Sequence, residues 1–304
     1  MKFMKNRKII PICVVLALIM AVGSALSCAA DSFTYYKGYK VRTISNTTAA
    51  LSGWYEKSEV LSVPARVLSR SIITIDSYSF NYDADLTAVD FSGASNLVSI
   101  GEGAFMGCSN LTEVSIPANV QYLSSSLFES CTSLEKAELN CEISKIDRQL
   151  FYGCSSLTEV SIPSTVEEID HFAFGNCTSL GLLLVPRSVT QIQSTSFSGC
   201  NNLTLAVWSD SYALEYAVEN EIPFVLLDGL LSGDVNGDQL VDVRDVTAIQ
   251  RCAADFEELN VVQRLTADVD RTGAVTIEDA TALQGFLVDF ETDLPIGEFL
   301  TDFT

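Results

Sequence analysis

A spacing of 23 residues recurs through the middle of this chain and constrains its fold more than any other feature. Three residue types keep this spacing through five consecutive units. They are phenylalanine (Phe105, Phe128, Phe151, Phe174, Phe197), cysteine (Cys108, Cys131, Cys154, Cys177, Cys200) and leucine (Leu111, Leu134, Leu157, Leu180, Leu203). Self-similarity at a fixed period of this length indicates a solenoid, in which stacked units share one core that no single unit could bury alone.

Each unit predicts a short strand that ends at a proline. In the unit FMGCSNLTEVSIPANVQYLSSSL, Val114 and Ile116 alternate with polar neighbours, which is the pattern of a half-buried strand. Pro117 ends the strand because it lacks an N–H and fixes its own φ. Val120 and Leu123 then point back inward. The sequence therefore predicts a β-rich solenoid with 23-residue repeats.

The motifs LTEVSIP, LTEVSIPSTVEEI and FGNCTSL resemble the leucine-rich repeats of bacterial surface antigens, the BspA-like class. Weaker units extend the resemblance upstream, and SYALEYAVENEIPFVLLD resembles the helix-plus-strand cap that ends such arrays. The resemblance implies a strand-rich N-terminal cap at 31–58, leucine-rich repeats at 59–208 and a C-terminal cap at 209–229. It also implies that the array binds a protein or cell-surface partner.

The cysteine column is expected to be structural. Its members share one inward-facing repeat position, where buried thiols act as small hydrophobic side chains. A secreted protein could instead form disulfides, whereas a straight column does not supply the converging ligands of a tetrahedral metal site. The outward strand positions are mostly polar and suggest a solvated face. Leu182 and Leu184 depart from this pattern and are expected to mark a contact with the C-terminal cap.

The N-terminus has the pattern of a secretory signal peptide at residues 1–30. Basic residues precede an apolar run from Ile9 to Leu26, and small residues follow. Pro11 and Gly23 interrupt the run, so a stable membrane span is not expected. Cys28 leaves a lipoprotein anchor open as an alternative. The chain is therefore expected to be secreted and extracellular.

Two acidic loops follow the array, 34 residues apart: GDVNGDQLVDVRDVTAIQR and ADVDRTGAVTIEDATALQ. Loop positions 1, 3, 5, 7, 9 and 12 supply the oxygen ligands of a calcium ion, with a backbone carbonyl at position 7. In the first loop these are Asp234, Asn236, Asp238, the Leu240 carbonyl, Asp242 and Asp245. In the second they are Asp268, Asp270, Thr272, the Ala274 carbonyl, Thr276 and Asp279. Position 6 favours glycine, which Gly273 provides, whereas Gln239 in the first loop is a compromise. Two Ca²⁺ sites are predicted.

A loop followed by only one helix, duplicated and ending in Asp, resembles the dockerin module of cellulosomes, here at 233–290 with a tail at 291–304. The resemblance implies a small all-α calcium-binding domain that docks onto a cohesin domain of a scaffold protein. Apolar residues, among them Val243 and Ile277, are expected to form its core, with a connecting helix at 257–265 whose Val261, Val262 and Leu265 face inward. The cohesin-binding positions that it implies are Val243, Arg244, Gln250, Arg251, Ile277 and Glu278.

Composition limits the remaining function classes. The net charge of −21 disfavours nucleic acid as a partner, because the surface repels phosphate. The single histidine, His171, excludes a multi-histidine metal site and is expected to be a surface residue between repeats. No segment outside the repeats and the dockerin is long enough for a catalytic domain. We therefore expect a secreted, non-catalytic cellulosome component that supports polysaccharide degradation. The alternatives are a dockerin-borne polysaccharide hydrolase or a carbohydrate-binding protein whose site lies in the array.

Overall fold

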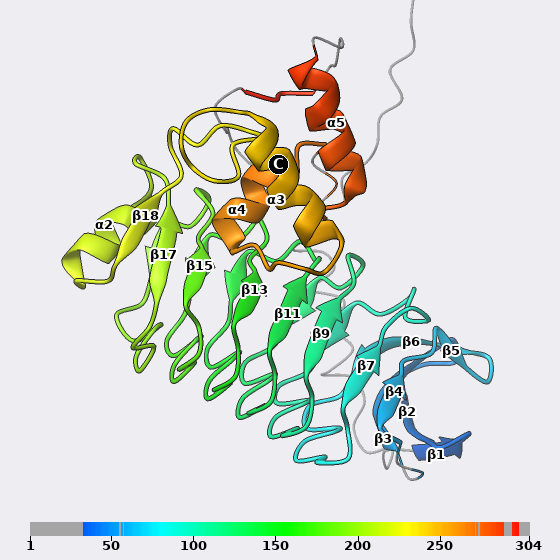
Figure 1. Ribbon diagram of the computed structural model, residues 1–304. Helices are drawn as coiled ribbons and strands as arrows, with labels where there is room; N and C mark the ends of the chain where they lie inside the picture. The colour runs from blue at the N-terminus through cyan, green and yellow to red at the C-terminus, as the bar shows by residue number, and fades with distance from the viewer. Residues whose placement is uncertain are drawn as a thin grey trace, which may run out of the picture.

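The computed structural model describes residues 33–54, 56, 58–270, 272, 274–288 and 294–297. The expected signal peptide and Cys28 lie outside the described residues. Figure 1 shows a curved stack of strands, with a small group of helices seated on one face near its C-terminal end. Within the described residues, no helix has both the length and the apolar character needed to cross a membrane. The predicted solenoid with an appended helical domain is confirmed.

The array begins with antiparallel strands that lead into the parallel stack. β1 (Phe33–Tyr36), β2 (Tyr39–Thr43) and β3 (Thr48–Trp54) are joined as neighbouring antiparallel pairs. β3 then pairs in parallel with β6 (Arg70–Ile75), which also takes the short β5 (Arg66–Val67). These strands cover the N-terminal end of the core.

Two rows of short parallel strands form the body of the solenoid. The long row contains β4 (Val60–Ser62), β7 (Ala88–Asp90), β9 (Glu113–Ile116), β11 (Lys136–Leu139) and β13 (Glu159–Ser161), followed by β15 (Leu182–Leu184), β17 (Thr204–Val207) and β18 (Phe224–Leu226). The short row contains β8 (Ser99–Ile100), β10 (Tyr122–Leu123), β12 (Lys145–Ile146), β14 (Glu168–Ile169) and β16 (Gln191–Ile192). Neighbouring strands are in register by one repeat, so Ala137 lies between Val114 and Val160. Each repeat position therefore becomes a column along the stack.

The phenylalanine column forms the centre of the core. Stacked rings run from Phe80 to Phe197, with successive centroids 5.5–5.8 Å apart and planes within 8–16° of parallel. Trp54 closes the column edge-on at one end, and Tyr216 of α2 (Tyr212–Glu219) at the other. Aromatic pairs of this kind add stability beyond the area they bury.

The cysteine column is structural, as the sequence predicts. All five cysteines are free thiols, four of them buried and Cys200 half-buried. Each Sγ donates to the carbonyl oxygen of the phenylalanine one repeat earlier, as Cys131 does to Phe105 at 3.1 Å. Burial raises the pKa of the Cys154 thiol well above its ordinary value. The Cys154 thiol therefore stays protonated and unreactive.

The C-terminal helices pack as a separate small core. α3 (Val243–Ala253) lies against α5 (Ile277–Leu287), with α4 (Val261–Ala267) between them in sequence. Segment 294–297 returns to the start of this unit, where Ile296 is buried and the Gly297 N–H donates to the Ser232 carbonyl at 2.7 Å. The buried core residues are Val235, Val246, Ile249, Leu259, Ala267, Val269, Ala280, Leu283 and Ile296.

Three expectations about this unit are wrong. The connecting helix begins at Val261 rather than at residue 257, because Asn260 and Gln263 form a capping box there. Val243 and Ile277 are exposed, at 67% and 53%, because each is the first residue of its helix, whereas the core uses later residues such as Val246. The inward orientation expected of Val262 and Leu265 is also wrong, since both pack against the repeat array.

Candidate metal centre

Both acidic loops end in the same local structure. Position 9 of each loop, Asp242 or Thr276, is the N-cap of the following helix, and position 12, Asp245 or Asp279, is its N3 residue. The side chain of each N3 residue accepts from the cap backbone N–H, which completes a capping box. The last residue of each loop is therefore fixed by the first turn of a helix.

The two position-12 carboxylates are fully buried and held in matching ways. Asp245 Oδ1 accepts from the N–H groups of Val235 and Asn236 at 2.9 and 3.1 Å. Asp279 Oδ1 accepts from those of Val269 and Asp270 at 2.9 and 3.3 Å. Because the two loops reproduce the same contacts 34 residues apart, the duplication seen in the sequence is also a structural one.

Burial makes these carboxylates costly to ionise. Desolvation raises the pKa of Asp245 and of Asp279, and in each loop a neighbouring carboxylate, Asp234 or Asp270, adds to the increase. A raised carboxyl pKa means that the ionised form, which predominates near neutral pH, destabilises the fold unless a cation balances it. The charge and the burial of both groups therefore suit a bound cation.

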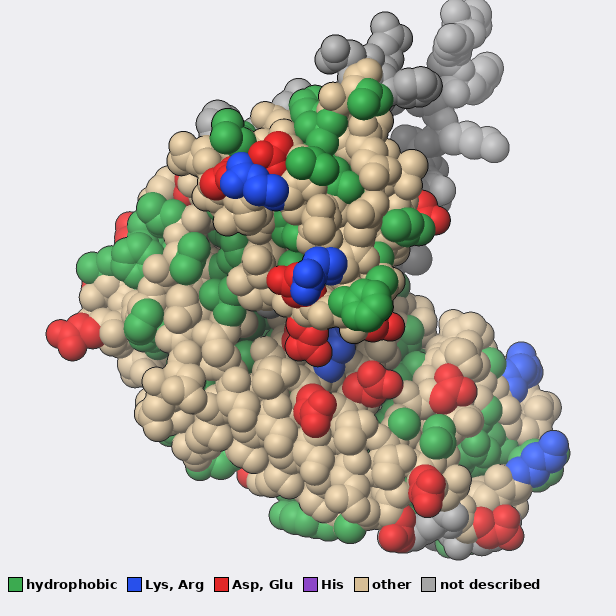
Figure 2. Space-filling view, viewed as in Figure 1, with side chains coloured by type: hydrophobic (Ala, Val, Ile, Leu, Met, Phe, Trp, Pro, Cys, Tyr) green, Lys and Arg blue, Asp and Glu red, His purple; other side chains and the backbone are tan. Residues whose placement is uncertain are grey.

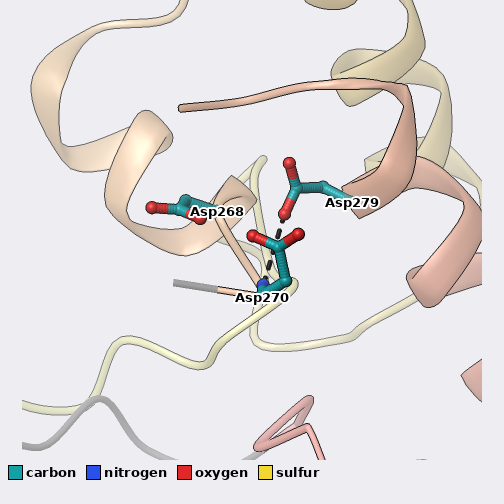
Figure 3. Close-up of side chains that lie close together, drawn as sticks. All are labelled: Asp268, Asp270 and Asp279. Atoms are coloured by element: carbon teal, nitrogen blue, oxygen red, sulfur yellow. Dashed lines mark hydrogen bonds between the residues drawn. The ribbon is translucent and has the colours of Figure 1, made fainter. Parts of the chain in front are cut away.

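The second loop brings its acidic groups together. Asp268, Asp270 and Asp279 each place a carboxylate oxygen within 4.8 Å of the others. Figure 3 shows the three side chains gathered in this loop. The Thr272 N–H donates to Asp268 and Asp270, at 3.0 and 3.1 Å, and so draws the loop around them. Hard oxygen ligands at this spacing suit Ca²⁺. Gly273, at the sixth position, lies outside the described residues.

The first loop is closed by hydrogen bonds around Asp234. Its carboxylate accepts from the N–H groups of Gly237, Asp238 and Gln239 at 2.8–3.1 Å. Gln239 has φ +66°, the left-handed conformation that position 6 requires and that a non-glycine residue adopts at a cost of about 1 kcal/mol. The compromise that the sequence indicates is therefore present in the backbone.

An arginine neutralises part of the first loop. Arg244 Nη2 lies 2.6 Å from Asp238 and 2.7 Å from Asp242, two of the predicted calcium ligands. Asn236 and Leu240 of this loop are exposed. The two loops therefore differ, because the carboxylates of the second loop converge on one another and two of those in the first pair with a side chain.

The predicted partner-binding residues lie on the outer ends of α3 and α5. Val243, Arg244, Arg251, Ile277 and Glu278 are exposed, and Gln250 is half-buried. Arg251 also pairs with Glu257 at 2.8 Å. Further exposed apolar side chains of this unit are Leu240, of which only the backbone carbonyl is predicted to take part in a site, together with Phe256 and Val288. Each of the three lies close to one end of a helix but outside it, where the amphipathic pattern of the helix does not predict burial.

His171 lies apart from these loops, in a turn of the repeat array. It is exposed, and its Nδ1 is 2.9 Å from the Thr195 hydroxyl. The expectation that it is a surface residue between repeats is confirmed.

Comparison with known proteins identifies both parts. Residues 73–204 match the family described as BspA type leucine rich repeat region, in six copies, and residues 232–288 match the dockerin type I domain. No curated protein matches the chain.

Similar solved structures include a leucine rich cell surface protein from Faecalibacterium prausnitzii (22% identity, 59% of this chain and 55% of that chain, TM-score 0.46). A leucine-rich repeat protein from Eubacterium ventriosum matches with 25% identity, 57% and 51% coverage and a TM-score of 0.45. One from Bacteroides ovatus matches with 22% identity, 60% and 52% coverage and a TM-score of 0.42. The chain spans about half the length of these three proteins. On the family matches, the chain is a fusion of a BspA-type leucine-rich repeat region with a C-terminal dockerin type I domain.

Proposed function

We propose that this chain is a secreted, non-catalytic cellulosome component. Its dockerin attaches it to a scaffold cohesin in a calcium-dependent way, while the repeat array binds a protein or cell-surface partner in support of polysaccharide degradation. The observation that carries the proposal is the duplicated loop and helix, each with a buried carboxylate at position 12. The matched families are both binding modules, which favours attachment over catalysis.

Calcium would be held by the same oxygen set in each loop. In the second loop Asp268, Asp270 and Asp279 would supply carboxylates, with Thr272, Thr276 and the Ala274 carbonyl completing the set. In the first loop Asp234, Asn236, Asp238, Asp242, Asp245 and the Leu240 carbonyl would do so. In each loop the ion would balance the negative charge of the buried position-12 carboxylate. It would also fix the position of the loop relative to its helix.

Replacing Asp279 by asparagine is expected to remove calcium from the second loop. The change deletes the charge of a fully buried ligand at nearly constant shape. Since changes to outer-shell partners already cost about 10–100-fold in metal affinity, a larger loss is expected here. Calorimetric titration of the full chain should then show one binding event instead of about two.

The neighbouring Glu278→Gln variant is the matched control for this experiment, because it removes an exposed carboxylate from position 11 of the same loop, which is not a predicted ligand position. It should leave the number of bound calcium ions unchanged. Equal calcium binding by wild type and Asp279→Asn would contradict the assignment of the second site.

Reversing the charges of Arg244 and Arg251 together is expected to weaken cohesin binding by at least about tenfold. Both lie exposed on α3, and interfacial arginines are frequent hot spots. Glu278, the second residue of α5, corresponds to Arg244, the second residue of α3. The two loop-helix halves of the dockerin therefore present opposite charges, which favours a single docking orientation. Surface plasmon resonance against immobilised cohesins measures the effect, with Glu278→Arg as the comparison. Equal losses from the two sets of changes would contradict a single orientation.

A further inference from the structure

One strand of the array breaks the pattern of its outward face. At the two outward positions of the long row, β9 carries Glu113 and Ser115, and β11 and β13 carry polar residues too. At the same repeat positions, β15 carries Leu182 and Leu184. Both leucines are half-buried in the whole chain. A pair of outward leucines on an otherwise polar surface indicates a contact with another element.

That element is helix α4 of the dockerin. Val262 and Leu265 of α4 pack on a buried cluster whose members also contact both leucines. Figure 1 shows α4 lying over this end of the long row. The buried cluster is Ala206, Trp208 and Leu227, and the side chains packed against it are Leu182, Leu184, Leu230, Val262 and Leu265. Trp208 is only 2% exposed, and the Arg187 guanidinium also covers its ring, 4.2 Å from the ring centroid. The expected contact of Leu182 and Leu184 with the cap is therefore correct but incomplete.

Charged side chains border the apolar contact. Arg264 of α4 forms an ion pair with Glu159 of β13, although the two residues are 105 positions apart in the sequence. Glu159 is also 3.9 Å from Lys136, which in turn pairs with Glu138 at 2.8 Å. An apolar centre with a polar border is the usual anatomy of a specific interface.

The dockerin uses different surfaces for this contact and for its own core. Leu259, which precedes the N-cap of α4, and Ala267, the last residue of α4, belong to the dockerin core, whereas Val262 and Leu265 face the array. Val243 of α3 and Ile277 of α5 remain exposed. Figure 2 shows hydrophobic side chains on the outer surface of this unit, away from the array.

We propose that the strand face at β13, β15 and β17 is an intramolecular docking site for α4. The contact holds the dockerin in one orientation on the array, so that a bound scaffold and the array's own partner have a fixed relative position. It also closes this part of the face to other ligands. The docking needs a folded dockerin but no cohesin, whereas the use of α3 and α5 by a scaffold rests on the proposed function.

The partner of the array is thereby directed to the uncovered strands β7, β9 and β11. They form a hollow of about 250 Å³, whose polar lining includes Glu113, Ser115, Lys136 and Glu138. Its occupant would need polar groups to match this lining, in which Lys136 and Glu138 form an ion pair at 2.8 Å. The α4 contact thus separates an occupied apolar half of the face from an open polar half.

Fluorescence of Trp208 tests the docking in the full-length chain. A Trp54→Phe background leaves Trp208 as the only tryptophan. The Val262→Asp/Leu265→Asp variant places carboxylates in the apolar cluster, and Arg264→Glu places like charges opposite each other. Both are expected to raise iodide quenching of Trp208 severalfold and to increase the radius of gyration in small-angle scattering. Neither substitution touches the dockerin core, and the far-UV circular dichroism spectrum checks that the fold is kept.

A charge swap separates docking from a general effect of mutation. Glu159→Arg alone should expose Trp208, and the Glu159→Arg/Arg264→Glu pair should restore its shielding. Glu113→Arg is the matched control, at the same repeat position two units earlier and outside the α4 contact. Unchanged quenching in the double aspartate variant, or failure of the swap to restore shielding, would overturn the proposal. Calcium and cohesin binding, measured on the same variants, should persist, so a failure of the proposed function would show separately.

Discussion

Replacing Phe151 by alanine is expected to lower the free energy of unfolding of the array by about 3–5 kcal/mol. The ring is fully buried and stacked between Phe128 and Phe174, with centroids 5.7 and 5.5 Å away. Both neighbours are held by their own stacking partners, so the space cannot be filled by collapse. Because repeat stability depends on contacts between neighbouring units, the loss also weakens coupling between the two halves of the array. Urea unfolding followed by circular dichroism measures it.

Phe256→Ala provides the matched control for this change. Phe256 is 79% exposed, on the dockerin, and its removal should change the stability by less than about 0.5 kcal/mol. Phe151→Leu should fall between the two, because it keeps part of the buried volume. Similar costs for Phe151→Ala and Phe256→Ala would contradict a core organised around the phenylalanine column.

Removing calcium with a chelator is expected to unfold the dockerin and leave the array folded. The dockerin core is small, and Asp245 and Asp279 are buried carboxylates that desolvation makes costly to ionise. Calcium at about 1,000 times its Kd would stabilise such a domain by about 4 kcal/mol per site, a large share of the stability of a module of this size. The helical signal of α3, α4 and α5 should therefore fall, while the strand signal persists. Identical spectra and melting curves with and without chelator would contradict the prediction.

The fold of the array could be predicted because one spacing determines several columns together. A repeat that places Phe151, Cys154 and Leu157 in register also fixes where each strand, turn and inward side chain lies. Stacking follows from the inability of one unit to bury its apolar face. The metal-ligand positions of the two acidic loops could also be predicted, because the spacing of metal ligands is a local property of the chain.

The relationship between the two domains could not be predicted in the same way. Val262 and Leu265 have the spacing of any inward-facing helical pair, and nothing local distinguishes a dockerin core from a neighbouring domain as their destination. The outward Leu182 and Leu184 signalled a contact but did not name the element that makes it. The pairing of Arg264 with Glu159 depends on tertiary structure alone.

The first residue of a helix was also difficult to predict from the sequence. The connecting helix was expected from its apolar residues, but its start is set by the polar capping box of Asn260 and Gln263. In the same way, Arg244 was assigned to the partner surface, and its side chain also pairs with Asp238 and Asp242. Side chains that serve two contacts are difficult to assign from spacing, because each pattern accounts for only one of them.

The most direct test of the central claim is calorimetric titration of calcium into the full-length chain, followed by binding to a panel of cohesin domains with and without chelator. The account predicts about two calcium ions per chain and cohesin binding that is lost when the chelator is present. Absence of calcium binding, or cohesin binding that survives the chelator unchanged, would contradict it.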